Sequence, residues 1–250
     1  MPLIKEKLEN TVKFVAISDV HEHDEIFFDL ISNFSFSSDF RLLFVGDAND
    51  KGAGDESFYK IVSYIKSLVD SGFAWYVKGN HELKKIKKAK KEAERSNSLH
   101  PLLKWIDQQP TAVHLSYENG QSYLGVHAGI NPKMTWDKLN YDIEVAYTRL
   151  VDSNGNNISI KLENDVWVPM KSGGVVWHEV YDGRFGYVIA GHQPNHDGPK
   201  FYNYSCNLDC GVFNTGKQVG LVFGCNGKEA MFESYGKPLL CSNKHFIKIV

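Results

Sequence analysis

In the first half of the chain, short apolar runs alternate with stretches in which apolar residues recur at helical spacing. Runs rich in β-branched and aromatic residues predict buried strands over Val12–Ser18, Arg41–Gly46 and Phe73–Gly79. Apolar residues at helical spacing predict helices near Asp24–Phe34, Glu56–Val69 and Leu83–Arg95. Alternation of strands and helices is typical of parallel strands joined by right-handed crossovers, so this half predicts an α/β arrangement.

The second half is richer in strands and turns. A Glu-Asn-Gly turn separates two apolar runs, Ala112–Ser116 and Ser122–His127, which predicts a hairpin. A helix is expected near Thr135–Leu150, and short strands are expected at Tyr187–Gly191, Phe201–Asp209 and Val219–Phe223. The polar stretch within residues 131–186 is interpreted as a lid-like insertion. The prediction is one domain over residues 1–250, of class α/β (α+β), with two mixed β-sheets.

Composition narrows the class of protein. The chain has 250 residues, of which 42% are apolar, and a formal net charge of −2. This charge balance argues against nucleic acid or an anionic membrane as a partner. The sequence contains no run of about 18 apolar residues, so no membrane span is predicted. The charged N-terminus and the presence of only four cysteines argue against secretion. A cytoplasmic enzyme is therefore the expectation.

Polar clusters follow five of the predicted strands. They read Asp19-Val20-His21, GDANDKG over residues 46–52, Gly79-Asn80-His81-Glu82, Val126-His127-Ala128-Gly129 and Gly191-His192. Ligands of α/β sheets bind beyond the carboxyl ends of strands, so these loops are expected to converge. Together they supply two carboxylates, an amide oxygen and three imidazoles, a donor set that suits Mn, Fe or Zn.

Each cluster taken alone also has a structural interpretation. Asp19-Val20-His21 could belong to a helix-capping loop, and Gly46-Asp47 occurs in many turns. Asn80 could be a left-handed turn residue, and a single histidine at a strand end is more often a core residue. Five such clusters, each after a predicted strand, favour a shared metal site.

The motifs SDVH, GDANDKG, KGNHE, VHAGI and AGHQP resemble the five signature blocks of the calcineurin-like metallophosphoesterases. They are most similar to the phosphoprotein-phosphatase branch, which includes bacterial and phage enzymes and the symmetrical diadenosine tetraphosphatases. The resemblance implies a sandwich of two mixed β-sheets flanked by helices. It also implies two divalent metal ions, with Mn²⁺ the first expectation and Fe or Zn as alternatives.

The resemblance implies a role for each matching residue. Asp19, His21 and Asp47 would hold the first ion. The second ion would be held by Asp47 as a bridge together with Asn80, His127 and His192. Asp50 would orient His81, which would donate a proton to the leaving oxygen after direct attack by a metal-bound hydroxide.

Two positions depart from the family pattern. Lys51 stands where the family usually has an arginine that grips phosphoryl oxygens, and lysine lacks the planar fork. A second family arginine has two candidates, Arg184 and Arg149. Arg184 is preferred because it lies between two glycines just before the strand that leads to His192. Substrate contacts are thus expected from Arg184, Lys51 and Asn80.

The expected function is hydrolysis of phosphomonoesters, with phosphoserine and phosphothreonine in proteins as the leading substrates. Hydrolysis of dinucleoside polyphosphates or other nucleotides is the alternative, and a metal-binding scaffold without turnover is a third. The metal motifs do not distinguish the first two, whereas the insertion could by shaping the pocket. The lysine-rich segment Lys84–Arg95 is either a solvated helix face or a surface that steers anionic substrates.

Overall fold

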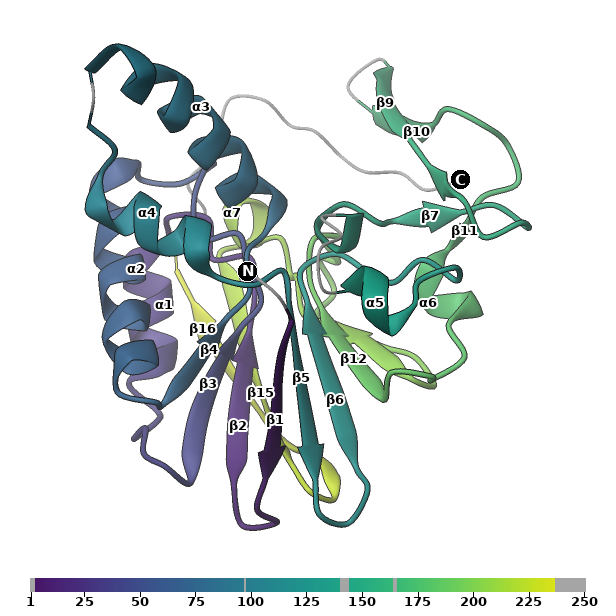
Figure 1. Cartoon of the computed structure of the whole chain (residues 1–250), viewed down its shortest axis with the longest axis horizontal. Coiled ribbons are helices and arrows are strands. Elements are labelled where there is room, and N and C mark those ends of the chain that lie inside the picture. Colours follow the sequence, from purple (N-terminus) through teal and green to yellow (C-terminus); the bar gives the residue numbers. More distant parts are fainter. Residues whose placement is uncertain (1–2, 97, 140–143, 164–165, 237–250) are drawn as a thin grey trace.

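The computed structural model describes residues 3–96, 98–139, 144–163 and 166–236, and two β-sheets packed face to face organise this part of the chain (Figure 1). Helices cover the outer face of one sheet, and the insertion covers the outer face of the other. This mixed α/β architecture confirms the predicted fold class.

The sheet beneath the helices contains the three parallel strands that the sequence predicts. Its strand order is β16-β15-β2-β3-β4, with β2 (Lys13–Ile17), β3 (Phe40–Phe44) and β4 (Ala74–Tyr76) parallel. The helices that connect or follow them are α1 (Asp24–Ile31), α2 (Asp55–Asp70) and α3 (Asn80–Ser96). Strands β15 (Lys217–Gly224) and β16 (Gly227–Tyr235) extend the sheet in antiparallel pairing.

The second sheet is also mixed, with the order β1-β5-β6-β12-β14-β13. Its strands are β1 (Ile4–Leu8), β5 (Ala112–Tyr117), β6 (Ser122–Val126), β12 (Tyr187–Ala190), β13 (Lys200–Phe201) and β14 (Ser205–Asn207). The predicted hairpin is confirmed, since β5 and β6 pair in antiparallel register. Strand β12 pairs in parallel with β6 and β14, which brings two of the polar motifs to the same edge.

Three apolar layers hold these elements together. Phe14, Leu43 and Trp75 of one sheet pack against Leu115 and Tyr123 of the other between the sheets. The opposite face of the helix-covered sheet packs on α1, α2 and α4 (Pro101–Gln108). The outer face of the second sheet is covered by the insertion, whose Trp177 and Phe185 are buried. Both sheets are therefore held rigidly beneath the loops that carry the polar motifs.

The predicted helix over Thr135–Leu150 is wrong. In this segment the described helical residues are α5 (Trp136–Leu139) and the 3₁₀ turn η1 (Glu144–Ala146), while residues 140–143 lie outside the described part. The carbonyl of Val145 accepts backbone hydrogen bonds from Ala128 and Gly129, at 2.8 and 3.1 Å. Tertiary contacts with the loop after β6 therefore replace the intrahelical pattern.

The predicted strand over Phe201–Asp209 is divided by a turn. Tyr202 donates its backbone N–H to Ser205, and β13 folds back on β14. Outside the insertion, four of the described elements were not expected from the sequence: β1, α4, β16 and the short helix α7 (Val212–Thr215). Strands β1 and β16 carry many charged residues, so their apolar pattern is weak.

The insertion contains two small sheets. They comprise β7 (Leu150–Val151), β8 (Asn157–Ile158) and β11 (Val175–Val176), and the hairpin of β9 (Ile160–Glu163) and β10 (Val166–Pro169). Helix α6 (Trp177–Val180) leads from them to β12. Within the described residues, none of the helices has the length and apolar character needed to cross a bilayer. The single-domain assignment of residues 1–250 remains a prediction.

Candidate metal centre

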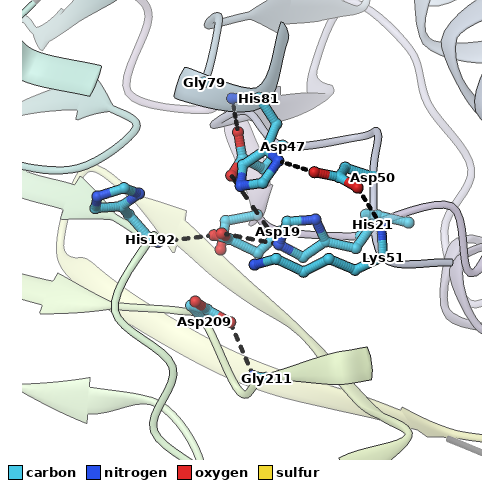
Figure 2. Close-up of polar contacts among 12 residues, drawn as sticks. Asp19, His21, Asp47, Asp50, Lys51, Gly79, His81, His192, Asp209 and Gly211 are labelled. Atoms are coloured by element: carbon cyan, nitrogen blue, oxygen red, sulfur yellow. Dashed lines mark hydrogen bonds and ion pairs between the residues drawn. The ribbon is translucent and has the colours of Figure 1, made fainter. Parts of the chain in front are cut away.

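Five loops converge at the carboxyl ends of the strands and carry the predicted ligands. The residues are Asp19, His21, Asp47, Asn80, His127 and His192. Figure 2 labels Asp19, His21, Asp47 and His192 among them. The loops lie together because the strands before them are hydrogen-bonded neighbours. Further backbone bonds join the loops, from Asp19 N–H to Gly46 and from Gly191 N–H to His127, at 2.9 and 2.8 Å.

Asp47 lies at the centre of this cluster. Its Oδ2 is 3.2 Å from Nε2 of His127, 3.7 Å from Nε2 of His81 and 4.0 Å from Nε2 of His21. Two groups of side chains could each hold a metal ion: His21 with Asp47 and His81, and Asp47 with His127 and His192. Asp47 belongs to both groups, which is the arrangement expected of a bridging carboxylate.

The remaining predicted ligands complete the two groups. Asn80 Oδ1 lies 3.0 Å from His127 Nε2, and His192 Nδ1 lies 3.1 Å from the same nitrogen. On the other side, Asp19 Oδ1 is 3.8 Å from His21 Nε2. Asp19 Oδ2 accepts the backbone N–H of His192 at 2.9 Å. The structure therefore brings all six predicted ligands together.

Carbonyl groups orient two of the imidazoles. Nδ1 of His127 donates to the carbonyl of Val45 at 2.8 Å, and Nδ1 of His21 donates to that of Asn49 at 3.0 Å. These bonds leave Nε2 of each ring directed at Asp47 as the nitrogen that would bind a metal ion. Such bonds to the distal ring nitrogen are usual for metal-binding histidines.

The electrostatics also suit cations. Burial lowers the pKa of His21, so this imidazole stays neutral as a ligand must. Burial alone would lower the pKa of His127, but the carboxylates of Asp47 and Asp19 raise it to about 10. Positive charge is thus stabilised where the second group of donors meets. The mixed oxygen and nitrogen donors fit Mn, Fe or Zn better than an all-oxygen Mg or Ca site.

The loop backbone is unusual in the same places. Among the described residues, seven that are not glycine have positive φ: Asp19, His21, Glu22, Asp47, Asp50, Lys51 and His192. Such conformations cost of order 1 kcal/mol or more each and cluster at functional sites. Glycine is required beside them, since a Cβ at Gly79 would overlap the Asp47 carboxylate and one at Gly191 would overlap Asp19. The strained loop backbone therefore lowers local stability while it holds the Asp19 and Asp47 carboxylates at the cluster.

Comparison with known proteins assigns the family. A model of the calcineurin-like phosphoesterases matches residues 12–196, which include all six predicted ligands. The chain belongs to the calcineurin-like phosphoesterase family. Members of this family hydrolyse phosphate esters and use divalent metal ions. No curated protein sequence matches the chain.

Solved structures share the phosphoesterase fold. A candidate diadenosine tetraphosphatase is 22% identical with a TM-score of 0.68, over 94% of this chain and 99% of that one. A protein serine/threonine phosphatase from Saccharomyces cerevisiae, similar to human PP5, is 13% identical with a TM-score of 0.60, over 94% and 84%. A cold-active protein-tyrosine phosphatase from a Shewanella species is 14% identical with a TM-score of 0.55, over 91% and 80%. At these identities the likeness shows the fold alone.

His81 and Asp50 form a pair at the edge of the phosphoesterase centre. Nδ1 of His81 lies 2.8 Å from Oδ2 of Asp50, and its backbone N–H donates to Asp47 Oδ1 at 3.0 Å. The hydrogen bond from His81 holds the pKa of the Asp50 carboxyl far below its usual range. Nε2 of His81 consequently faces Asp47 and the space between the two groups of donors.

The two predicted arginine candidates lie in different surroundings. Arg149 places Nε 2.7 Å from Nε2 of His192, directly against the ligand cluster. Arg184 lies on an exposed turn, where it bonds to the Asp182 carboxylate and to the carbonyl of Pro132, both at 2.8 Å. Among the described residues, Arg184 has no hydrogen bond or ion pair with the cluster. The structure therefore places Arg149 against the ligand cluster, whereas Arg184, which the sequence favoured, lies away from it.

Lys51 lies beside the first group of donors. Figure 2 shows its side chain extended alongside His21, with the ammonium end toward Asp19. The ammonium also lies 4.5 Å from the ring centre of Phe213. A lysine here places a point charge at the open side of the cluster.

Sequence reasoning missed Asp209, a carboxylate beside the cluster that is 2% exposed. Its Oδ1 accepts the N–H of Gly211 at 2.8 Å (Figure 2). Burial raises the pKa of Asp209. Burial lowers the pKa of the Arg149 guanidinium, and the negative charge of Asp209 opposes this effect. No local signal in the sequence placed Asp209 beside Asp19 and Asp47, which lie more than 150 positions away.

Two buried glutamates that support the loops were also missed. Glu82 accepts backbone N–H groups from Asp47, Ala48 and Gly79, at 2.9, 2.7 and 2.7 Å. Glu22 accepts N–H groups from three residues of the loop after β3, Asp50, Gly52 and Gly54. Each carboxylate ties several donors of that loop to one point, which fixes the loop in its strained conformation.

Proposed function

We propose that this phosphoesterase is a metal-dependent phosphatase that hydrolyses phosphomonoesters, with phosphoserine and phosphothreonine in proteins as the leading substrates. The observation that carries the proposal is the Asp47 carboxylate shared by two groups of donors, with the Asp50–His81 pair at their edge. This arrangement combines a two-ion site with a proton donor directed at it.

We assign the ligands to two ions as the family resemblance implies. Asp19, His21 and Asp47 would hold one ion, and Asp47, Asn80, His127 and His192 would hold the other. When bound, two divalent ions would acidify the attacking water and neutralise charge on the phosphoryl oxygens. Mn²⁺ is the first choice for both positions. The glycines beside Asp19 and Asp47 keep the two carboxylates in place for this task.

His81 would protonate the leaving oxygen. Asp50 accepts the proton of Nδ1, which directs Nε2 into the centre and stabilises the charged imidazolium. Serine and threonine leave as alkoxides, which are strongly basic and need a proton as the phosphorus–oxygen bond breaks. A nucleoside diphosphate leaves far more readily without one. The Asp50–His81 pair therefore supports a phosphomonoester with an alkyl leaving group.

Two cations would bind the phosphoryl oxygens that face the cleft. Arg149 lies against His192 and can offer two parallel N–H donors. Lys51 would add a point charge from the opposite group of donors. Arg149 thus takes the role for which the sequence favoured Arg184. Asn80 could contact the substrate through its amide nitrogen while its oxygen binds metal.

A dinucleoside polyphosphate hydrolase is the second candidate. The match to a candidate diadenosine tetraphosphatase extends over nearly the full length of both chains and includes the insertion. The chemistry at phosphorus would be the same, and the pocket shaped by the insertion would select the leaving group.

A direct comparison of substrates tests the proposal. The purified chain would be assayed with Mn²⁺ on a phosphoserine peptide, a dinucleoside tetraphosphate and an aryl phosphate, with Asp47→Asn as the inactive control. We expect turnover of the peptide and the aryl phosphate. Preference for the dinucleotide by tenfold or more in kcat/KM would support the second candidate, and no turnover above the control would refute both.

A further inference from the structure

Helix α3 presents a continuous row of exposed lysines on the face that carries His81. Successive helical residues turn by about 100°, so His81, Lys84, Lys88 and Lys91 lie within about 80° of one another around the axis. Lys87 borders this row, and all four lysines are exposed. We call Lys84, Lys87, Lys88 and Lys91 the lysine stripe.

The lysine stripe lies on the side of α3 that faces away from the core. Ile86 is buried and Ala89 packs against the core beneath the helix. Two further lysines on the flanks are already paired, Lys85 with Asp55 and Lys90 with Asp107, at 2.5 and 2.7 Å. None of the four stripe lysines makes an ion pair with a described residue.

The lysine stripe begins at the catalytic edge of the centre. The first residue of α3 is the predicted ligand Asn80, and the second is His81. Lys84 lies one turn further, close enough to Asp50 for its charge to favour the ionised form of that carboxyl. Asp50 in turn holds His81. The stripe therefore runs outward from the position of the leaving group.

Positive charge is concentrated on helix α3. Helix α3 carries seven of the 28 basic residues of a chain whose net charge is −2. In Figure 1 this helix extends along one side of the top of the sandwich, across from the insertion. A local excess of positive charge on an otherwise acidic protein attracts an anionic group to that place.

We propose that the lysine stripe binds acidic residues that flank the phosphorylated residue of a peptide substrate. This inference rests on the proposed phosphatase function and adds a substrate class to it. Along the helix axis, Lys84 and Lys91 lie about 4.5 and 15 Å from His81, at 1.5 Å per residue. An extended peptide advances about 3.3 Å per residue, so the acidic positions lie about one to five residues from the phosphoresidue.

The stripe fits an acidic peptide better than a single-stranded nucleic acid. Non-specific binding of single strands combines basic residues with aromatic side chains on which the bases stack. Helix α3, from Asn80 to Ser96, contains no Phe, Tyr or Trp on which a base could stack. The four stripe lysines extend over about 10 Å along the helix, the length of about three extended peptide residues.

The test compares two peptides on matched variants. One variant changes Lys87, Lys88 and Lys91 to Gln, which keeps the helix propensity of the segment and leaves Lys84, beside Asp50, unchanged. The control changes three exposed lysines outside α3 to Gln: Lys104, Lys138 and Lys171. The substrates are a phosphoserine peptide with three acidic residues on either side, the same peptide with Gln in their place, and an aryl phosphate.

We expect the stripe variant to raise KM for the acidic peptide about 5- to 30-fold, as for the loss of several exposed ion pairs. Its kcat, and its activity on the Gln peptide and the aryl phosphate, should stay within twofold of the wild type. The preference for the acidic peptide should weaken with salt in the wild type and in the control variant.

Equal KM values for the two peptides in the wild type would overturn the inference, as would an equal loss in the control variant. Loss of binding to an oligonucleotide, without loss of peptide preference, would also overturn it and assign the stripe to nucleic acid. Failure of the phosphatase proposal gives a different result, because neither peptide would then be turned over.

Discussion

Removal of the Arg149 side chain should strongly lower the kcat/KM of this phosphoesterase, whereas removal of the Arg184 side chain should leave kcat/KM nearly unchanged. Nε of Arg149 donates to Nε2 of His192 at 2.7 Å, and the edge formed by its two terminal nitrogens can make two parallel bonds to a phosphoryl group. Loss of one such oxyanion contact costs about 10²–10³-fold, or roughly 2.7–4 kcal/mol of transition-state stabilisation. We therefore expect Arg149→Ala to lower kcat/KM by about that factor.

Arg184 provides the matched control. Its side chain is 38% exposed and pairs with Asp182, whose side chain is 55% exposed, so the pair contributes about 0–1 kcal/mol to the free energy of unfolding. Arg184→Ala should stay within twofold of the wild type in kcat/KM. Arg149→Lys should recover part of the loss, because it restores charge without the planar fork.

Steady-state kinetics on an aryl phosphate and a phosphopeptide would measure these effects. Metal content and thermal unfolding of each variant show whether the centre and the fold are intact. The reasoning fails if Arg184→Ala loses activity and Arg149→Ala does not. It also fails if Arg149→Ala loses activity only in proportion to lost metal, since Arg149 would then support His192 alone.

Three further predictions concern the metal centre. Exhaustive chelation should abolish activity and added Mn²⁺ should restore it; full activity in metal-free protein would refute the two-ion site. His81→Asn should lower kcat about 10²–10⁴-fold with both ions retained, and less for aryl phosphates, whose leaving groups need little protonation. An equal loss across leaving groups would argue against the acid role. Asp47→Asn should reduce metal occupancy at both ion positions, and Asp19→Asn should reduce it at one. Elemental analysis measures this, and two bound ions in Asp47→Asn would contradict the bridging role of Asp47.

The ligand residues could be predicted from the sequence because each follows a strand directly. Strands such as Val12–Ser18 and Arg41–Gly46 are recognised from local apolar content, and the residue after a strand lies at the sheet edge whatever the rest of the fold does. Asp19, Asp47 and His127 were located in this way. The same local signals predicted the parallel strands and the hairpin.

Elements whose conformation depends on partners were predicted poorly. The segment Thr135–Leu150 has helical periodicity, but the carbonyl of Val145 is taken by the loop after β6, and the long helix does not form. Strands β1 and β16 carry alternating charges, and they are strands because a neighbouring strand pairs with them. Backbone hydrogen bonds between distant segments do not depend on a local sequence pattern, so these elements could not be predicted from one.

The supporting residues of the centre depend on tertiary structure for the same reason. Chain position favoured Arg184, and only the docking of the turn after η1 against the loop after β12 places Arg149 beside His192. Glu82 and Asp209 are ordinary acidic residues in sequence, yet burial makes each a fixed acceptor for backbone N–H groups. Which charges meet inside a protein is decided by the packing of whole sheets, because burial and the low dielectric around it arise only when both sheets are in place.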